Sequence, residues 1–245
     1  MSPQRNAAPG NRLLASLSRR NSQKFIASCD HVELEFAAVL SDPGERTTHV
    51  YFPLTGFISL VTALDDGERL EVGIVGDEGM LGASLILGIR TSSQHALVQG
   101  AGTALRMTAV LFARYCKTDL LLQKQVSGYL HVLMGQLAQM AACTHYHAVE
   151  ARLARWLLMT RDRAHSDEFR LTHEFLAFML GVRRVGVTEA ASALQERGLI
   201  SYHRGHIAVI DGAGLVKASC CCYQQALDLY DQTLGSHRAS PTRRN

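Results

Sequence analysis

The stretch from Leu171 to Ile210 constrains the fold more than any other part of the chain. It opens with Thr172, a residue suited to cap a helix, and continues as an apolar segment that stops at Gly181. A second segment starts with two arginines and stops at Gly198. Glycine tolerates the left-handed backbone of a sharp corner between short helices, so this order predicts a helix-turn-helix.

The residues after Gly198 predict a wing. Apolar residues alternate around the basic tip formed by His203, Arg204 and Gly205, as in a short β-hairpin. In a helix-turn-helix, the first residues of the second helix enter the DNA major groove, where an arginine fork matches the O6 and N7 acceptors of guanine. The residues predicted to bind DNA are Arg183, Arg184, Val185, Thr188, Glu189, His203 and Arg204.

The distribution of charge agrees with a nucleic-acid partner. The net charge of +3 over 245 residues is too small to indicate a polyanion by itself. The segment from Arg152 to Arg204, however, contains nine arginines and six acids and therefore holds the whole surplus. A local basic surplus of this kind favours contact with phosphates.

The first half of the chain has the pattern of β-structure. From Val32 to Met107, short apolar stretches alternate with turn signals, which predicts an antiparallel roll or barrel. The clearest hairpin is expected at Asp65, Asp66 and Gly67, because Asp-Gly supplies the positive φ of a tight turn.

After Thr108 the apolar spacing becomes helical. Steps of three and four predict a long amphipathic helix from Asp119 to about Thr144, and a second helix from His147 to about Arg163. The apolar coverage of the long helix is broader than one coiled-coil seam, so we expect it to contact both its own barrel and a second copy of the chain. The residues predicted for this dimer interface are Val126, Tyr129, Leu130, Leu133, Leu137 and Met140.

These patterns together predict an α+β chain with an N-terminal antiparallel β-roll, a long central dimerisation helix and a C-terminal winged helix-turn-helix. The expected boundaries are a loose tail at 1–20, the roll at 21–118, the central helix at 119–146, the winged domain with an added C-terminal helix at 147–234, and a second loose tail at 235–245.

Several classes of protein are disfavoured. No phosphate-binding loop, nucleophile elbow or zinc-protease motif occurs, so we predict no catalytic residues and no enzyme. No apolar run is long enough for a membrane helix and no secretory signal opens the chain, so we expect no membrane partner and a cytoplasmic location.

The cysteines and two histidines leave alternatives open. Cys220, Cys221 and Cys222 are interpreted as packing thiols, with redox or metal sensing as the alternative. His145 and His147 are interpreted as hinge or interface residues, with haem or metal ligation as the alternative. We therefore predict no cofactor and no metal site.

The whole layout, ending in residues 171–210, resembles the Crp/Fnr superfamily of bacterial transcription regulators. The resemblance covers roughly residues 25 to 230, and the turn VGDEGMLG is similar to the glycine-acid-glycine turn of the family's roll. It implies a homodimer that binds two-fold-related half-sites of double-stranded DNA, with a roll that senses a small molecule. RNA polymerase would be a further partner of such a regulator, although no motif for that contact is readable.

Departures from the family pattern limit what the resemblance implies. Alignment with cyclic-nucleotide-binding members places an effector pocket at Asp77, Glu78, Gln94 and His95. Gln94 and His95 stand where those members have the Arg-Ser or Arg-Thr pair that holds the cyclic phosphate, so cyclic AMP is not the expected effector. Cys29 alone lies where oxygen-sensing members cluster three cysteines, so an iron-sulfur cluster is not expected either.

The base-reading positions of the second helix also differ from those of the best-known family members, which have an Arg, a Glu and a second Arg there. This chain has Arg184, Val185 and Glu189 at these positions, and only the first arginine is retained. An identical operator is therefore not expected. The alternative function is a ligand-binding or scaffolding β-barrel protein whose helical end contacts proteins instead of DNA.

Overall fold

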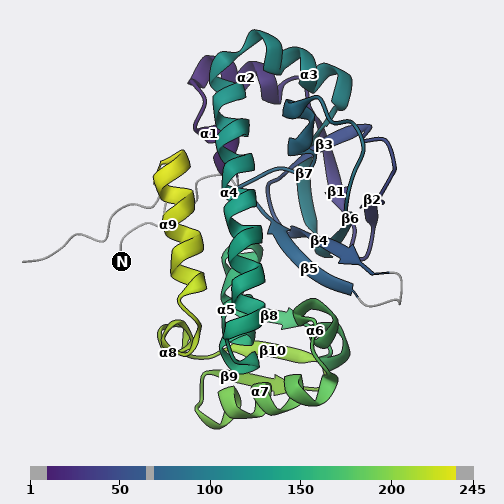
Figure 1. Cartoon of the computed structure of the whole chain (residues 1–245). Helices are drawn as coiled ribbons and strands as arrows, with labels where there is room; N and C mark the ends of the chain where they lie inside the picture. The colour runs from purple at the N-terminus through teal and green to yellow at the C-terminus, as the bar shows by residue number, and fades with distance from the viewer. Residues whose placement is uncertain (1–9, 65–68, 236–245) are drawn as a thin grey trace, which may run out of the picture.

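Two small antiparallel sheets form the N-terminal roll in the computed structural model, which describes residues 10–64 and 69–235 (Figure 1). The first sheet has the order β1-β7-β3, with bounds Asp30–Leu34, Gly102–Thr108 and His49–Pro53. The second has the order β2-β6-β4-β5, with bounds Val39–Ser41, His95–Gly100, Phe57–Ala63 and Arg69–Val75. Buried side chains of both sheets meet in one cluster, which includes Leu34 and Ala104 from the first sheet and Ile58 and Val98 from the second. The predicted antiparallel roll is confirmed.

The strongest sequence hairpin joins β4 to β5. These strands pair antiparallel up to the pair Ala63 and Arg69. The turn itself, predicted at Asp65, Asp66 and Gly67, lies outside the described residues.

The predicted N-terminal tail is wrong from residue 10 onward, because two short helices stand there: α1 (Arg12–Ala15) and the start of α2 (Arg19–Ile26). The Asn11 side chain accepts a hydrogen bond from Leu14 N at 3.2 Å and donates to the carbonyl oxygens of Pro53 and Gly79 at 3.0 and 2.8 Å. Leu13 and Leu14 are buried against the roll. The polar composition of this segment does not reveal these contacts, because Asn11 makes them with a strand and a turn that are distant in the sequence.

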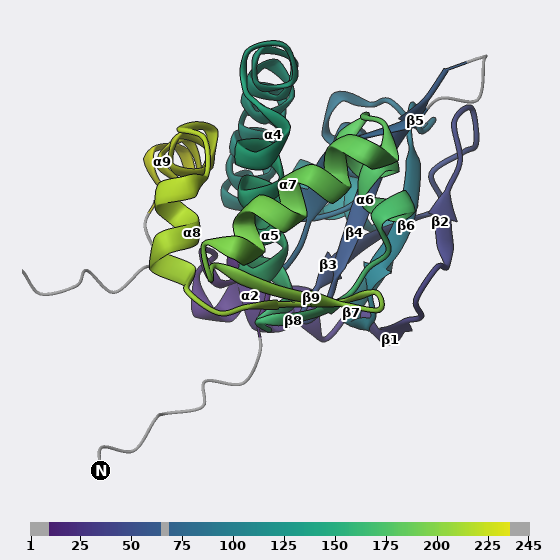
Figure 2. The same ribbon diagram turned by 90° about the horizontal axis from the view of Figure 1, so that it is seen from below.

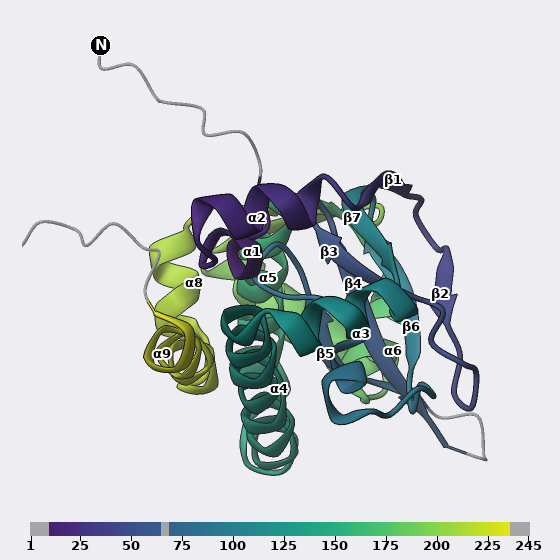
Figure 3. The same cartoon turned by 90° about the horizontal axis from the view of Figure 1, so that it is seen from above.

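The helical half begins with α3 (Ala109–Thr118) and continues into α4 (Leu120–Tyr146), close to the predicted bounds of the central helix. Asp119 begins α4, since its Oδ1 accepts hydrogen bonds from Leu121 N and Leu122 N. A short 3-10 helix, η1 (Ala83–Leu87), lies against α4. Seen from above, α4 lies between α9 and the strands of the roll (Figure 3).

The C-terminal part is a small helical domain with a three-stranded sheet of order β8-β10-β9. Its elements are α5 (Val149–Ala164), β8 (Glu168–Arg170), α6 (His173–Leu180), α7 (Arg184–Glu196), β9 (Ile200–His203), β10 (His206–Val209), α8 (Gly212–Ala218) and α9 (Cys222–Leu234). Figure 2 shows α7 and the β-hairpin at the lower end of the molecule, facing the viewer.

The roll and the helical domain share a hydrophobic core. Phe57, Val61 and Ile74 of the roll belong to the same buried cluster as Trp156 of α5 and the apolar residues of α6 and α7. Trp156 Nε1 also donates a hydrogen bond to the buried Glu71 carboxylate on β5, at 2.7 Å. The two parts therefore behave as one packed body in this conformation.

The added C-terminal helix, α9, returns along α4 instead of staying with the helical domain (Figure 1). Two glycines of α4 permit the approach, because a Cβ on Gly128 would meet Leu234 and a Cβ on Gly135 would meet Leu229. One face of the central helix is thus covered by its own chain.

No helix among residues 10–64 and 69–235 has the length and apolar character needed to span a bilayer.

Candidate nucleic-acid interface

The helix-turn-helix is formed by α6 and α7, as predicted. Thr172 Oγ1 accepts a hydrogen bond from Phe175 N at 3.1 Å and so caps α6. Gly181 ends α6 with a φ of +60°, the left-handed conformation that the sharp corner requires. Arg183 precedes the first turn of α7 as its N-cap residue, one position earlier than the helix itself begins. The helix buries Val187, Ala190, Ala191 and Leu194.

The opposite face of α7 is free of the rest of the chain. The predicted DNA-contacting residues Arg183, Arg184, Val185, Thr188 and Glu189 are all exposed. Val185 is 60% exposed, although an apolar side chain usually avoids water at such a position. An exposed row of two arginines, a valine and a threonine suits contacts with base edges and thymine methyl groups.

The wing is the hairpin of β9 and β10. Its two-residue turn places Arg204 and Gly205 at φ values of +49° and +80°, as a type I′ hairpin turn needs. His203 and Arg204 are exposed at this tip, where the sequence predicted them. Strand β8 adds Arg170 opposite His206, and both side chains are exposed. Sequence reasoning missed Arg170 because a three-residue strand gives no readable alternation, and it missed His206 although this residue lies in the predicted hairpin.

A second missed group holds the reading helix in place. His173 of α6 stacks on Tyr202 of the wing, with ring centroids 4.4 Å apart and an interplanar angle of 12°. Its Nδ1 lies 2.9 Å from Thr188 Oγ1 on α7. Burial, and next the nearby Arg184 guanidinium, lower the pKa of His173, which favours the neutral ring. His173 therefore connects α6, α7 and the wing, and it fixes the orientation of α7 relative to the wing.

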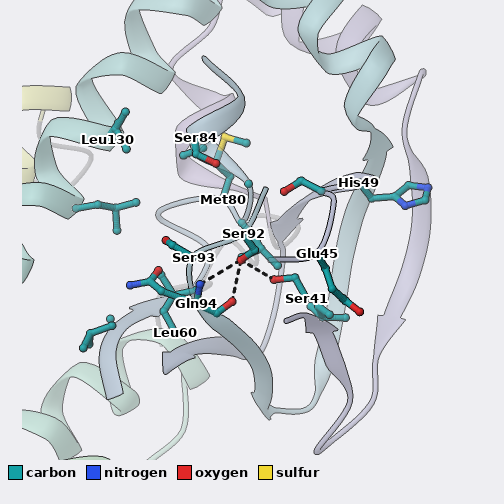
Figure 4. Close-up of a pocket in the computed structure, with 18 of the residues that line it drawn as sticks. Ser41, Glu45, His49, Leu60, Met80, Ser84, Ser92, Ser93, Gln94 and Leu130 are labelled. Carbon is teal, nitrogen blue, oxygen red and sulfur yellow. Dashed lines mark hydrogen bonds between the residues drawn. The ribbon is translucent and has the colours of Figure 1, made fainter. Parts of the chain in front are cut away.

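A cavity of about 570 Å³ lies between the roll and α4 (Figure 4). Its polar lining includes Ser41, Ser92 and the predicted Gln94, which are joined by hydrogen bonds: Ser41 Oγ donates to Ser92 Oγ at 3.2 Å, and Ser92 Oγ donates to Gln94 O at 2.8 Å. The apolar side of the cavity is made by α4 through Leu130, Leu133, Met134 and Leu137.

The other three predicted pocket residues are not in this cavity. His95 Nδ1 instead lies 2.6 Å from the Asp42 carboxylate. Glu78 forms a buried ion pair with Arg163 of α5 at 2.9 Å, and Asp77 lies 3.2 Å from His165 Nε2. The assignment of these three residues to the pocket is wrong.

For Asp77 and Glu78 the reason is the path of the turn at residues 76–79. Gly76 lies against Arg163 and Gly79 against Tyr129, so closely that a side chain at either position would clash. The Tyr230 hydroxyl of α9 donates to Glu78 O at 2.8 Å. The turn therefore faces the junction of α4, α5 and α9, away from the cavity.

The predicted dimer residues divide into two groups. Val126 and Tyr129 are buried within the chain, against the roll and α1, so a partner cannot reach them and this part of the prediction is wrong. Leu130, Leu133 and Met140 are half-buried and Leu137 is 40% exposed. Met134, which was not predicted, is 63% exposed on the same outer side. Helical spacing identified α4 as apolar but did not separate the face toward the roll from the face toward solvent.

A helix-turn-helix with an exposed arginine-led helix and a basic wing defines a DNA-binding regulator. The family model of the Crp-like helix-turn-helix domain matches residues 151–218, which span α5 to α8. Residues 151–218 are thus similar to the DNA-binding domain of Crp-type regulators, and the chain as a whole is similar to Crp/Fnr-type transcription regulators. This similarity favours DNA binding over the alternative of a scaffold protein.

Individual relatives agree with that assignment. The global nitrogen regulator of Nostoc sp. is 25% identical over 181 residues, which cover 68% of this chain and 79% of the relative. The structure of FixK2 from Bradyrhizobium japonicum superposes with a TM-score of 0.67 at 14% identity, covering 79% of this chain and 98% of that one. A CRP-family transcriptional regulator from Thermus thermophilus has a TM-score of 0.63 at 19% identity, with coverages of 77% and 96%. The structural likenesses show the shared fold, and the relatives from Nostoc and Thermus thermophilus are described as regulators.

Proposed function

We propose that this regulator acts as a homodimer that binds two-fold-related half-sites on double-stranded DNA, with α7 of each copy in the major groove. The observation that carries the proposal is the exposed row Arg183, Arg184, Val185 and Thr188 at the start of α7, beside the basic wing. Arg184 reads a guanine and Arg204 contacts a phosphate in this scheme, because a bidentate arginine specifies a base and a wing tip reaches the backbone.

The second copy contacts the outer side of α4. Leu130, Met134 and Leu137 form an apolar strip there that neither the roll nor α9 covers fully. A two-fold axis along this strip would set the spacing between the two α7 helices, as closed dimers require. Met134→Glu together with Leu137→Glu is expected to yield monomers in light-scattering chromatography, while Lys124→Glu, an exposed change on the same helix, leaves the dimer intact.

The cavity is the proposed effector site. Its floor is the polar group Ser41, Ser92 and Gln94, and its α4 side uses the same residues, Leu130 and Leu137, that face the second copy. A small polar molecule bound there would favour one placement of α4, and with it one spacing of the α7 helices. Gln94 is neutral, so the cation at the position of the family's phosphate-binding arginine is missing, and Arg46 is the arginine that lines this cavity instead. This different arrangement supports an effector other than cyclic AMP.

The test is selection of DNA from a random pool, followed by fluorescence anisotropy on the selected sequence and on a scrambled version. We expect an inverted repeat to be selected. Arg184→Ala is expected to weaken binding to the repeat by about 1 to 3 kcal/mol and to relax the preference for one base. Arg114→Ala, an exposed change on α3 and outside the helix-turn-helix, is the matched control. Equal loss of affinity in both variants, or no preference for any sequence, would refute the assignment of α7 as the reading helix.

A further inference from the structure

Four side chains with metal-binding atoms meet where α4 ends: Cys143, His147, Cys220 and Cys222. All four ligand atoms lie within 4.8 Å of one another. The Cys143 and Cys220 sulfurs are 3.6 Å apart, and Cys222 Sγ is 3.6 Å from His147 Nδ1. The three cysteines are buried and the histidine is half-buried. The group lies apart from both the α7 surface and the cavity.

Two segments far apart in the sequence bring these residues together. Cys143 and His147 are one helical turn apart at the end of α4, so both point to the same side. Cys220 and Cys222 flank the start of α9, with the exposed Cys221 between them pointing away. The sequence favoured a packing role for Cys220, Cys221 and Cys222. The structure places Cys143 and His147 beside Cys220 and Cys222, which favours metal binding by these four residues instead.

The spacing fits a tetrahedral ion. With metal-sulfur bonds of about 2.3 Å and metal-nitrogen bonds of about 2.0 Å, a tetrahedron has edges of about 3.8 Å between sulfurs and about 3.5 Å between sulfur and nitrogen. The observed 3.6 Å contacts match both edges. Three cysteines and one histidine form a closed ligand set that is typical of structural zinc. An iron-sulfur cluster fits less well, since its ligands bind different irons and stand farther apart.

Charge supplies an independent observation. Arg152 and Arg155 of α5 are buried, and neither forms an ion pair with a carboxylate within the part of the chain that the structure describes. Among the described residues, Arg155 donates only to the sulfur atoms of Met140 and Met159, which are weak acceptors, and Arg152 donates to the carbonyl oxygen of Leu180. The Nε atoms of both arginines have no partner there, and the Glu71 carboxyl group acts on Arg155 without forming an ion pair with it. Buried cations require nearby negative charge. One Zn²⁺ with three thiolates and a neutral imidazole has a net charge of −1 and would supply it.

We propose that Cys143, His147, Cys220 and Cys222 bind one Zn²⁺ ion that fixes the start of α9 to the junction of α4 and α5. Binding displaces the three thiol protons into solvent, so no oxidant or reductant takes part. The ion holds α9 against the central helix at its lower end, while Tyr230 and the glycines of α4 hold it farther up.

The experiment uses the untagged full chain, purified under reducing conditions without added metal. Elemental analysis is expected to find about one zinc per chain. After removal of zinc with a chelator, Co²⁺ is expected to give the strong visible bands of a tetrahedral site and a thiolate-to-cobalt charge-transfer band. Cys222→Ser should lose zinc and weaken that band, whereas Cys221→Ser, one position away and exposed, should retain both.

Three results would overturn the proposal. One is a reduced, folded wild-type chain that takes up neither Zn²⁺ nor Co²⁺. Another is a cobalt spectrum without thiolate charge transfer, or one that Cys143→Ser and Cys222→Ser leave unchanged. The third is a disulfide between Cys143 and Cys220, found by mass spectrometry, in a chain that still binds no metal after reduction. Metal uptake by the wild-type chain is measured directly, so the proposal can be refuted even if a variant fails to fold.

Discussion

Glu71 gives the most direct test of how the roll and the helical domain are held together. Its side chain on β5 is 1% exposed and accepts hydrogen bonds from Ser59 Oγ and from Trp156 Nε1. Burial raises the pKa of Glu71 from 4.5 to about 7, and the two hydrogen bonds and the nearby arginines offset only part of that rise. The folded protein therefore holds a proton on Glu71 at pH values where the unfolded chain has released it.

The sign of the pH effect follows from this difference in bound protons. The contribution of Glu71 to the free energy of unfolding is complete below about pH 4.5 and falls as the pH rises toward 7, because the unfolded chain binds fewer protons in that interval. Each unit of pKa difference corresponds to about 1.4 kcal/mol, so the full loss is about 3 kcal/mol by pH 8.

Glu71→Gln removes the charge and keeps both hydrogen-bonding positions, since the amide oxygen accepts from Trp156 and the amide nitrogen donates to Ser59. We expect the variant to match the wild type near pH 4.5 and to exceed it by about 3 kcal/mol at pH 8. Trp156 is the single tryptophan of the chain and contacts residue 71 directly, so its fluorescence reports urea unfolding at the relevant place.

The chain concentration must be equal in all titrations, because dimerisation adds to apparent stability. Glu45→Gln, a change at an exposed carboxylate, controls for the altered net charge. A stability difference between Glu71→Gln and wild type that is the same at pH 5 and at pH 8 would refute the reasoning.

Three further predictions concern other contacts. Asn11→Ala is expected to lower the free energy of unfolding by about 2 kcal/mol, since it removes a helix cap and two buried hydrogen bonds; urea denaturation measures the loss, and an unchanged midpoint would contradict it. Arg204→Ala is expected to weaken binding to all DNA sequences alike and to lower the salt slope of anisotropy titrations by about 0.9, whereas a change in base preference would mean that the wing reads bases. Gly135→Val is expected to cost about 1 to 3 kcal/mol because its side chain meets Leu229 of α9, while Gly186→Ala on α7, with open space around it, should cost nothing in the same thermal melts.

The sequence was sufficient for the elements whose signals are local. Thr172, Gly181 and Gly198 mark the ends of α6 and α7 through backbone preferences that act within a few residues, and these bounds are confirmed. The central helix is also confirmed, since its apolar spacing continues without interruption from Leu120 to Tyr146.

Features that depend on distant contacts could not be predicted. Asp77 and Glu78 were assigned to the pocket by alignment alone, and only the positions of Arg163 and His165 show that they face the domain junction. Likewise nothing near residue 220 in the sequence indicates that Cys143 approaches it. Helical periodicity gave the apolar character of the central helix but not which neighbour covers each of its faces.

The common core of roll and helical domain limits how such a protein can be recombined. A DNA-binding half cut out near residue 147 would leave behind Phe57, Val61 and Ile74, and would expose the ring of Trp156 together with the apolar side of α6. A chimera that joins this helical domain to another sensor would therefore need matching apolar residues on the strands of that sensor that correspond to β4 and β5. Exchange of the sensor would therefore require compensating changes in both the roll and the helical domain.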